Sequence, residues 1–365
     1  MNTLFKQEKA VLVGIELSSS QQVPVNQSLE ELKQLTDTAR AQVVGQLTQK
    51  RTKPDQKYYI GSGKLEELKA AIALHQADLV IFDVELSASQ ERNLATALDT
   101  KVIDRTRLIL DIFAQHARSH EGKLQVELAQ SSFLLTRLTG HGILMSRLGG
   151  GIGTRGPGET KLEQDRRYIR KRISELKHEI EKVRKERSIR REKRKRSDLP
   201  LVALVGYTNA GKSTLLNTLT QANVFTEDKL FATLDTTVRR LNLPSGQTIL
   251  LSDTVGFIQK LPHQLIASFR ATLEEVTEAD LLLHIVDASH PYFEDQINAV
   301  YTVLEELNSA TKPVITVFNK SDRLSGKIPK KLLARYQPAV VISALKKNGL
   351  EELQDSLVKA LCPQP

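Results

Sequence analysis

The stretch GYTNAGKST at 206–214 constrains the fold of this chain more than any other part of the sequence. It follows an apolar run, LPLVALVGY, that is typical of a strand, and it precedes LLNTLTQA, which is typical of a helix. The pattern G-x-x-x-x-G-K-[ST] therefore lies between a predicted strand and a predicted helix, as a phosphate-binding loop requires. Its glycines let the backbone wrap phosphate groups, and the amides and the helix N-terminus point at negative charge. We expect Lys212 to reach the β- and γ-phosphates and Ser213 to hold Mg²⁺.

The run TILLSDTVGF supplies a second phosphate-side element. It places Asp253 at a strand end, where the carboxylate can bind Mg²⁺ directly or through water, and the amide of Gly256 can meet the γ-phosphate. Many GTPases carry a Gln after this glycine to orient the attacking water, but here the residue is Phe257. The sequence therefore predicts slow hydrolysis by the isolated protein and a partner that completes the site. A missing arginine finger alone is worth about 10³–10⁵ in rate.

Two later stretches predict which base is bound. VFNKSD supplies Asn319, Lys320 and Asp322, and VISAL supplies Ser343 and Ala344 for the guanine carbonyl edge. The Asp carboxylate can accept both hydrogen bonds from the N1–H and 2-amino groups of guanine, whereas adenine would leave it unpaired. Sites of this kind discriminate by roughly 10⁴ or more, so GTP and GDP are the expected ligands.

The stretch LFATLDTTVRRL at 230–241 lies between these elements. A GTPase needs a mobile loop here whose Thr closes over Mg²⁺ and the γ-phosphate, and the pattern leaves Thr233, Thr236 and Thr237 open as candidates. In the phosphate loop, Asn209 is typical of potassium-activated GTPases, which makes K⁺ a second candidate cation.

The rest of the chain predicts two further parts. Residues 1–111 alternate short apolar runs with helix-like stretches, which indicates a small parallel α/β domain. One of these helices, at 63–76, has an apparent apolar stripe at Leu65, Leu68, Ile72 and Leu74. Residues 112–197 predict a long antiparallel helical hairpin around a glycine-rich loop at 148–158. The remaining residues, 198–365, predict a P-loop domain with a doubly wound, mainly parallel sheet.

The second helix of the hairpin carries an apolar seam and most of the positive charge. The seam spacing is that of a heptad repeat, and its members are Leu162, Ile169, Ile173, Leu176, Ile180 and Val183. Residues 166–196 contain 16 Lys/Arg and five Glu, a net charge of +11 in a chain whose total is +9. This asymmetry indicates a polyanionic partner. Since Tyr168 is the one aromatic residue there, duplex or shape recognition of RNA is favoured over base stacking.

The glycine-rich loop contains Gly151, Gly153 and Gly156 in a G-x-G-x-x-G spacing. A dinucleotide fold would require a strand before it, and TGHGILMSRL ends a predicted helix instead, so we set that reading aside. A surface turn and a contact with RNA phosphates both remain open on the residues alone.

Together, GYTNAGKST, FATLDTTVRRL, DTVGF, NKSD and GGGIGTRGPGETKLEQDRR resemble the HflX family of translational GTPases. The resemblance covers nearly the whole chain and includes YYIGSGK at 58–64 and the stretch at 102–130. It implies that Thr233 is the magnesium ligand, and that the glycine loop and basic helix contact the ribosome. It also implies binding to the large (50S) ribosomal subunit and its rRNA, and splitting of ribosomes into subunits under stress. Longer members carry a further C-terminal domain, whereas this sequence ends soon after a predicted helix, GLEELQDSLVKAL.

The motifs and the resemblance together give a set of predicted site residues. Catalytic roles fall to Lys212, Thr233 and Gly256, and metal binding to Ser213 and Thr233, with Asp253 acting through water. The predicted nucleotide contacts are Gly206, Tyr207, Thr208, Asn209, Ala210, Gly211, Lys212, Ser213, Thr214, Phe231, Ala232, Thr233, Leu234, Asp235, Asp253, Thr254, Val255, Gly256, Asn319, Lys320, Ser321, Asp322, Ser343, Ala344 and Leu345. The predicted RNA contacts are Arg147, Arg155, Lys161, Arg166, Arg167 and Arg170.

The leading functional hypothesis is a ribosome-stimulated GTPase that dissociates ribosomes. One alternative is a GTPase of large-subunit assembly or RNA remodelling, and another is a GTP-switched adaptor unrelated to ribosomes. The single cysteine, Cys362, fits a reducing compartment, and no apolar run approaches the roughly 18 residues of a membrane span. We therefore expect a cytoplasmic monomer, with peripheral membrane association left open. The residues show no motif for ATP binding in the N-terminal part.

Overall fold

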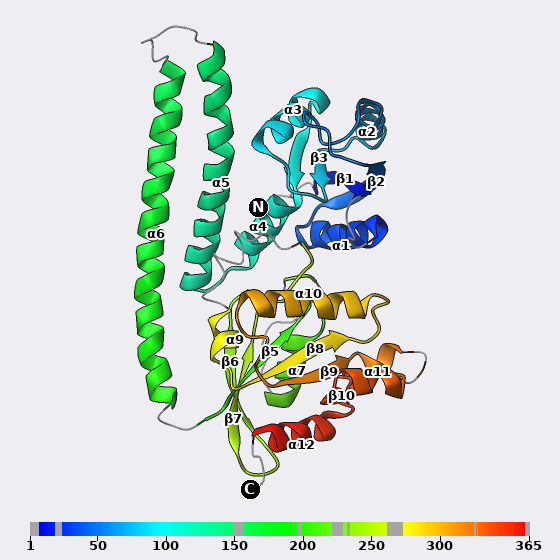
Figure 1. The fold of residues 1–365 in the computed structure, drawn as a ribbon, viewed down its shortest axis with the longest axis vertical. Helices are drawn as coiled ribbons and strands as arrows, with labels where there is room; N and C mark the ends of the chain where they lie inside the picture. The colour runs from blue at the N-terminus through cyan, green and yellow to red at the C-terminus, as the bar shows by residue number, and fades with distance from the viewer. Residues whose placement is uncertain are drawn as a thin grey trace, which may run out of the picture. The chain divides into compact units, whose positions relative to one another are not determined.

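The structure is a computed structural model of the chain (Figure 1). It describes residues 7–18, 24–148, 157–195, 199–220, 229–231, 234–260, 273–324, 326 and 328–361, with side chains other than those of 139–148, 157–162 and 188–195. These residues form two compact units, the first comprising 1–115 and 124–179 and the second comprising 116–123 and 180–365. Two helices, α5 (His120–Leu148) and α6 (Pro157–Lys195), each run from one unit into the other.

The first unit contains a four-stranded parallel sheet in the order β2-β1-β3-β4. Its elements are β1 Lys9–Leu17, α1 Val25–Thr38, β2 Gln42–Arg51, α2 Ser62–His75, β3 Leu79–Phe82, α3 Ala88–Leu98, β4 Lys101–Asp104 and α4 Arg105–His116. Successive side chains of β1 point to opposite faces, so Val11 and Val13 join the apolar cluster formed with α2 and α3. On the other face α1 packs closely on Gly14, where a Cβ would lie 2.7 Å from Cγ2 of Val25.

The hairpin helices of this unit meet along the predicted apolar seam. On α6, Leu176 is fully buried, and Ile169 and Ile173 are half-buried, while the residues between them are mostly exposed. The Arg172 guanidinium donates to Glu127 on α5 at 2.7 Å. The heptad spacing thus placed one face of α6 against its neighbour, as expected.

The second unit contains a six-stranded sheet in the order β10-β9-β8-β5-β7-β6, in which β6 alone is antiparallel. Its elements are β5 Leu201–Gly206, α7 Lys212–Thr220, β6 Thr237–Asn242, β7 Thr248–Asp253, α9 Glu274–Glu278, β8 Leu281–Asp287, α10 Phe293–Glu306, β9 Val314–Asn319, η1 Ser321–Arg323, α11 Lys330–Arg335, β10 Ala339–Val341 and α12 Leu350–Leu361.

Helices cover both faces of this sheet, as a buried parallel sheet requires. Alternate residues of β5 divide between two apolar clusters: Val202 and Leu204 pack with α7 and α12, while Ala203 and Val205 pack with α9 and α10. Strand β5 lies between β7 and β8, so the strand order reverses at its carboxyl end. Ligands bind at such a switch point in doubly wound sheets, and the GYTNAGKST loop begins there.

The predicted fold class is confirmed: an α/β N-terminal part, a helical hairpin and a P-loop fold with a mainly parallel sheet. The predicted apolar stripe of α2 was wrong at one residue. Leu74 is 78% exposed because it lies off the row formed by Leu65, Leu68 and Ile72. The domain boundaries at 111 and 197 remain predictions, since α5 and α6 cross between the two units.

Candidate nucleotide site

The phosphate loop leaves β5 in a conformation that glycine makes possible. Gly211 has φ +96°, and a Cβ there would lie 2.3 Å from Nδ2 of Asn319. Asn319 joins two parts of the site, because its Nδ2 donates to the carbonyl of Ala210 at 2.9 Å and its Oδ1 accepts from the amide of Ala344 at 2.9 Å. The loop and the predicted base-binding segment are therefore held together by one buried side chain.

Lys212 lies within the loop and is buried. Its Nζ donates to the carbonyl oxygens of Gly206 at 3.1 Å and Tyr207 at 2.8 Å. Burial lowers the pKa of Lys212 to about 8, although the nearby Asp253 carboxylate acts in the opposite direction. A partly desolvated ammonium in a loop of this shape is suited to bind phosphate oxygens.

The two side chains predicted to face Mg²⁺ are adjacent. The Ser213 hydroxyl donates to Oδ2 of Asp253 at 2.6 Å, and Asp253 is fully buried at the end of β7. A hydroxyl beside a carboxylate is an oxygen donor set of the kind that Mg²⁺ takes together with phosphate oxygens. The residues present therefore fit that ion.

Phe257 is part of the apolar core. Its side chain is 1% exposed and packs among Val205, Leu282 and Val300. Its amide donates to the carbonyl of Gly206 at 3.1 Å, and its carbonyl accepts from the amide of Thr208 at 2.8 Å. The ring therefore fixes this loop against the sheet and does not face the phosphate side.

Gly256 packs closely against the phosphate loop. A Cβ at this position would lie 2.7 Å from the Cα of Thr208 and 3.0 Å from Nζ of Lys212. Any larger residue would have to push the two loops apart. The amide of Gln259 donates to the Tyr207 hydroxyl at 2.8 Å, which ties the end of the same segment to the phosphate loop.

Beside the predicted base-binding segment lies an acid outside the sequence motifs, Asp287 at the end of β8. Oδ2 of Asp287 pairs with Nζ of Lys320 at 2.7 Å, and Oδ1 accepts from Ser289. The available signal was its position, since Asp287 ends the strand LLLHIVD one strand away from NKSD. The neighbouring Ser343 hydroxyl donates to Asp322, and this hydrogen bond lowers the pKa of the Asp322 carboxyl.

The other predicted nucleotide contacts differ in their burial and in their hydrogen-bond partners. Phe231 and Leu234 are buried, Thr254 donates to the carbonyl of Leu204 at 2.6 Å, and Leu345 is 67% exposed. Ala232 and Thr233 lie outside the described residues, so the predicted magnesium threonine is untested. The Asp235 carboxylate accepts from the amides of Arg118 and Ser119.

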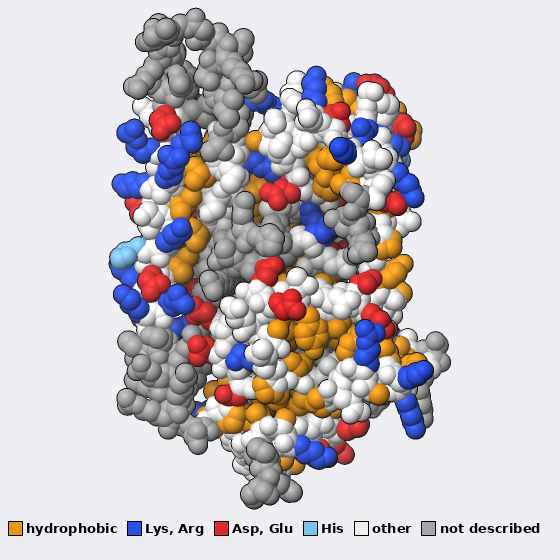
Figure 2. Space-filling model, in the orientation of Figure 1, with side chains coloured by type: hydrophobic (Ala, Val, Ile, Leu, Met, Phe, Trp, Pro, Cys, Tyr) orange, Lys and Arg blue, Asp and Glu red, His pale blue; other side chains and the backbone are white. Residues whose placement is uncertain are grey.

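Lysine and arginine side chains lie along the exposed side of α6, with acidic side chains among them (Figure 2). Among the side chains of this helix that the structure describes, the exposed basic ones are those of Arg167, Arg170, Lys171, Lys177, Lys182, Arg184 and Lys185. Arg166 is half-buried and pairs with Glu163 at 3.6 Å. Arg155 lies outside the described residues, as do the side chains of Arg147 and Lys161.

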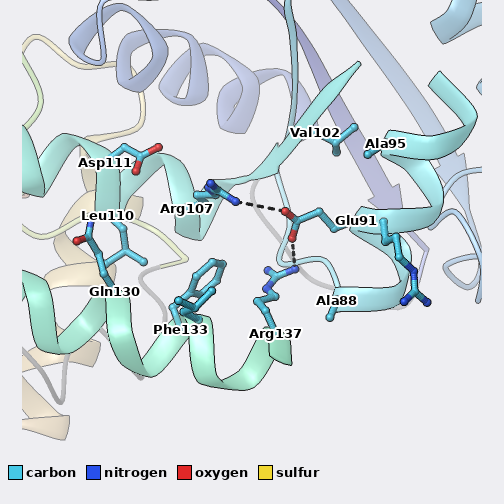
Figure 3. A pocket seen from close by; sticks show the side chains of 12 residues that line it. Ala88, Glu91, Ala95, Val102, Arg107, Leu110, Asp111, Gln130, Phe133 and Arg137 are labelled. Carbon is cyan, nitrogen blue, oxygen red and sulfur yellow. Dashed lines mark hydrogen bonds and ion pairs between the residues drawn. The ribbon is translucent and has the colours of Figure 1, made fainter. Parts of the chain in front are cut away.

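The first unit has a cavity of about 440 Å³ between α3, α4 and α5 (Figure 3). Glu91 pairs there with Arg137 at 2.5 Å and with Arg107 at 3.5 Å, and the Arg137 guanidinium lies 4.5 Å from the centre of the Phe133 ring. Burial raises the pKa of Glu91 and of Asp111, which also lines the cavity. None of its lining residues belongs to the nucleotide motifs.

These features together are typical of a P-loop GTPase. They are a phosphate loop at the switch point, a lysine, a hydroxyl–carboxylate pair and a segment that fits guanine. Three family models match the chain in succession: a GTP-binding GTPase N-terminal region at 26–114, its middle region at 116–194, and a 50S ribosome-binding GTPase at 201–320.

Curated relatives give the family. A GTPase HflX of Caldanaerobacter subterraneus subsp. tengcongensis is 52% identical over 97% of this chain and 81% of its own length. A GTPase HflX of Escherichia coli is 48% identical over 87% of this chain and 74% of its own length. The chain belongs to the HflX family and is a GTPase.

Solved structures agree on the fold. A protein called SsGBP, in complex with GDP, is 26% identical, covers 98% of this chain and 99% of its own, and gives a TM-score of 0.54. In the part of the chain that the structure describes, no helix has the length and apolar character needed to cross a membrane.

Proposed function

We propose that the chain binds GTP and Mg²⁺ at this site, associates with the large ribosomal subunit and separates ribosomes into subunits under stress. The observation that carries the ribosomal part is the basic exposed side of α6, in a helix that continues into the GTPase unit. The family model described as a 50S ribosome-binding GTPase supports the same partner.

At the nucleotide, each residue has a definite task. The amides of the phosphate loop and Lys212 would bind the phosphates, and Asp322 with Ser343 would select guanine. Ser213 and Asp253, with Thr233 as the family implies, would hold Mg²⁺, which supplies positive charge to neutralise the phosphates. Gly256 would offer its amide to the γ-phosphate, and K⁺ beside Asn209 is a further proposed cation.

In the proposed switch, GTP binding drives the separation of the ribosomal subunits, and GTP hydrolysis releases the protein from the ribosome. GTP would order the loops carrying Thr233 and Gly256 and so favour the ribosome-bound state, and hydrolysis would relax both loops. Phe257 cannot orient water, so the ribosome is the proposed source of the missing catalytic group.

Sedimentation of purified ribosomes tests this function. Vacant 70S ribosomes mixed with the protein and a non-hydrolysable GTP analogue should shift to free subunits in a sucrose gradient, and GDP should have little effect. Unchanged 70S peaks at saturating protein would contradict splitting. The assembly alternative instead predicts precursor particles in cells that lack the protein.

A further inference from the structure

The two residues that precede α5 bind the Asp235 carboxylate, which comes from the nucleotide side of the second unit. Oδ2 of Asp235 accepts from the amides of Arg118 at 3.0 Å and Ser119 at 2.8 Å, and Oδ1 accepts from the Ser119 hydroxyl. All of these residues belong to the same unit. Asp235 thus fills part of the hydrogen-bonding capacity that every helix N-terminus leaves open.

The arrangement is specific to the residues present. The Ser119 hydroxyl also accepts from the amide of Gly122 at 2.9 Å and therefore caps α5. At Gly122 a Cβ would lie 2.3 Å from Oδ1 of Asp235. The absence of a side chain at this position lets the carboxylate approach the helix.

Asp235 also lies two residues before the strand that pairs with the predicted metal acid, Asp253. Two residues after it, Thr237 begins β6 and pairs directly opposite Asp253 in the antiparallel ladder. Asp253 in turn accepts from Ser213 of the phosphate loop at 2.6 Å. A short path of backbone and hydrogen bonds therefore joins the phosphate loop to the start of α5.

Ion pairs fix the same end of the hairpin. Arg187 of α6 pairs with Glu121 of α5 at 2.5 Å, and Arg184 pairs with Glu274 of α9 at 2.6 Å. Glu121 and Glu274 are both buried. The first turn of α5 is thus tied to α6, and each helix continues beyond this unit into the other.

We propose that Asp235 and Ser119 form a latch that couples the nucleotide site to the helical hairpin. A change at 234–236 with the bound nucleotide would alter the cap on α5, and α5 would carry that change along the hairpin. By linkage, a ligand on the hairpin would alter nucleotide affinity to the same degree. This inference rests on the proposed nucleotide site, and Asp235 and Ser119 act in it as positioning residues.

Hydrogen exchange on the full chain tests the latch without ribosomes. Amide exchange at 118–123 is compared in the complexes with Mg²⁺–GDP and with a Mg²⁺-bound non-hydrolysable GTP analogue. In the wild type we expect the two nucleotides to give rates that differ by about fivefold, the size of one lost helix cap. In Ser119→Ala and Gly122→Ala the difference should shrink to less than about twofold, and Ser119→Thr should restore it.

The matched control is Ser87→Ala. Ser87 caps α3 in the first unit, where its hydroxyl accepts from the amide of Gln90 at 3.2 Å. This variant loses a cap of the same kind but should keep the nucleotide-dependent exchange at 118–123.

The outcomes separate the latch from the proposed function. Equal exchange at 118–123 with both nucleotides bound overturns the latch and leaves the GTP site intact. A wild-type difference that survives in both Ser119→Ala and Gly122→Ala also overturns it. Failure of the wild type to bind either nucleotide, measured by a fluorescent GDP analogue, overturns the proposed site and the latch together.

Discussion

At the residue scale, Phe257 stands where many GTPases have a water-orienting Gln, and its role in this chain is to pack in the core. Its ring lies in the core, and its amide and carbonyl bond to the phosphate loop. We expect Phe257→Gln to lower the free energy of unfolding by about 3 kcal/mol, because it loses apolar packing and buries an amide. The GTPase rate should not rise, since the side chain does not face the phosphates.

Thermal unfolding and a phosphate-release assay check both parts of this prediction. Phe257→Leu is the control and should cost less, about 1–2 kcal/mol, because the substitution stays apolar. A Phe257→Gln protein of unchanged stability with a faster rate would show that this residue reaches the nucleotide.

Asp322 allows a second residue-scale prediction. Its carboxylate is oriented by Ser343 and can accept from the 2-amino group of guanine, which inosine lacks. Asp322→Ala should therefore reduce the preference for GDP over IDP by about tenfold or more, measured by calorimetric titration. Asp287→Asn is the matched control: Asp287 holds Lys320, so this variant should weaken both ligands equally and keep their ratio.

At the element scale, the sequence was most informative where a local pattern decides the structure. Apolar periodicity located α2 and the buried face of α6, and the strand–loop–helix context located the phosphate loop. Strand β10 ends at Val341, and two residues later the Ser343 hydroxyl donates to Asp322.

Contacts between distant segments could not be predicted in this way. Asp287 meets Lys320 because β8 and β9 are neighbours in the sheet, and Asp235 meets Ser119 across more than a hundred residues of chain. Spacing within one stretch contains no information about such pairs. For the same reason, the sequence did not predict that the first turn of α5 belongs to the GTPase unit.

The basic side of α6 gives a prediction at this scale. Replacing Arg167, Arg170 and Lys177 by Ala should weaken binding to the large ribosomal subunit. If each side chain neutralises a phosphate, the slope of log K against log salt should flatten by up to about 3. The control, Lys330→Ala with Lys331→Ala, removes exposed charges from α11 and should leave the slope unchanged. Equal slopes for both variants would place the RNA contact elsewhere.

At the scale of the whole molecule, the two units have separate sheets and separate cores, and two helices run between them. The GTP site lies in one unit, and four of the seven exposed basic side chains described on α6 lie in the other, at Arg167, Arg170, Lys171 and Lys177. A partner that binds the basic face can influence hydrolysis through α5 and α6, which have residues in both units, or through a contact of its own with the nucleotide. We therefore expect any stimulation of the GTPase rate by the ribosome to require the complete chain.

The last prediction concerns the GTPase rate of the complete chain, measured with and without purified large ribosomal subunits. The basal rate should be low, because Phe257 leaves the attacking water without an orienting side chain, and subunits should raise it by about tenfold or more. Repeating the assay in K⁺ and in Na⁺ tests the proposed cation at Asn209, since equal rates would remove that role. A fast basal rate that subunits leave unchanged would mean that the site is self-sufficient, and hydrolysis would then have no ribosomal trigger.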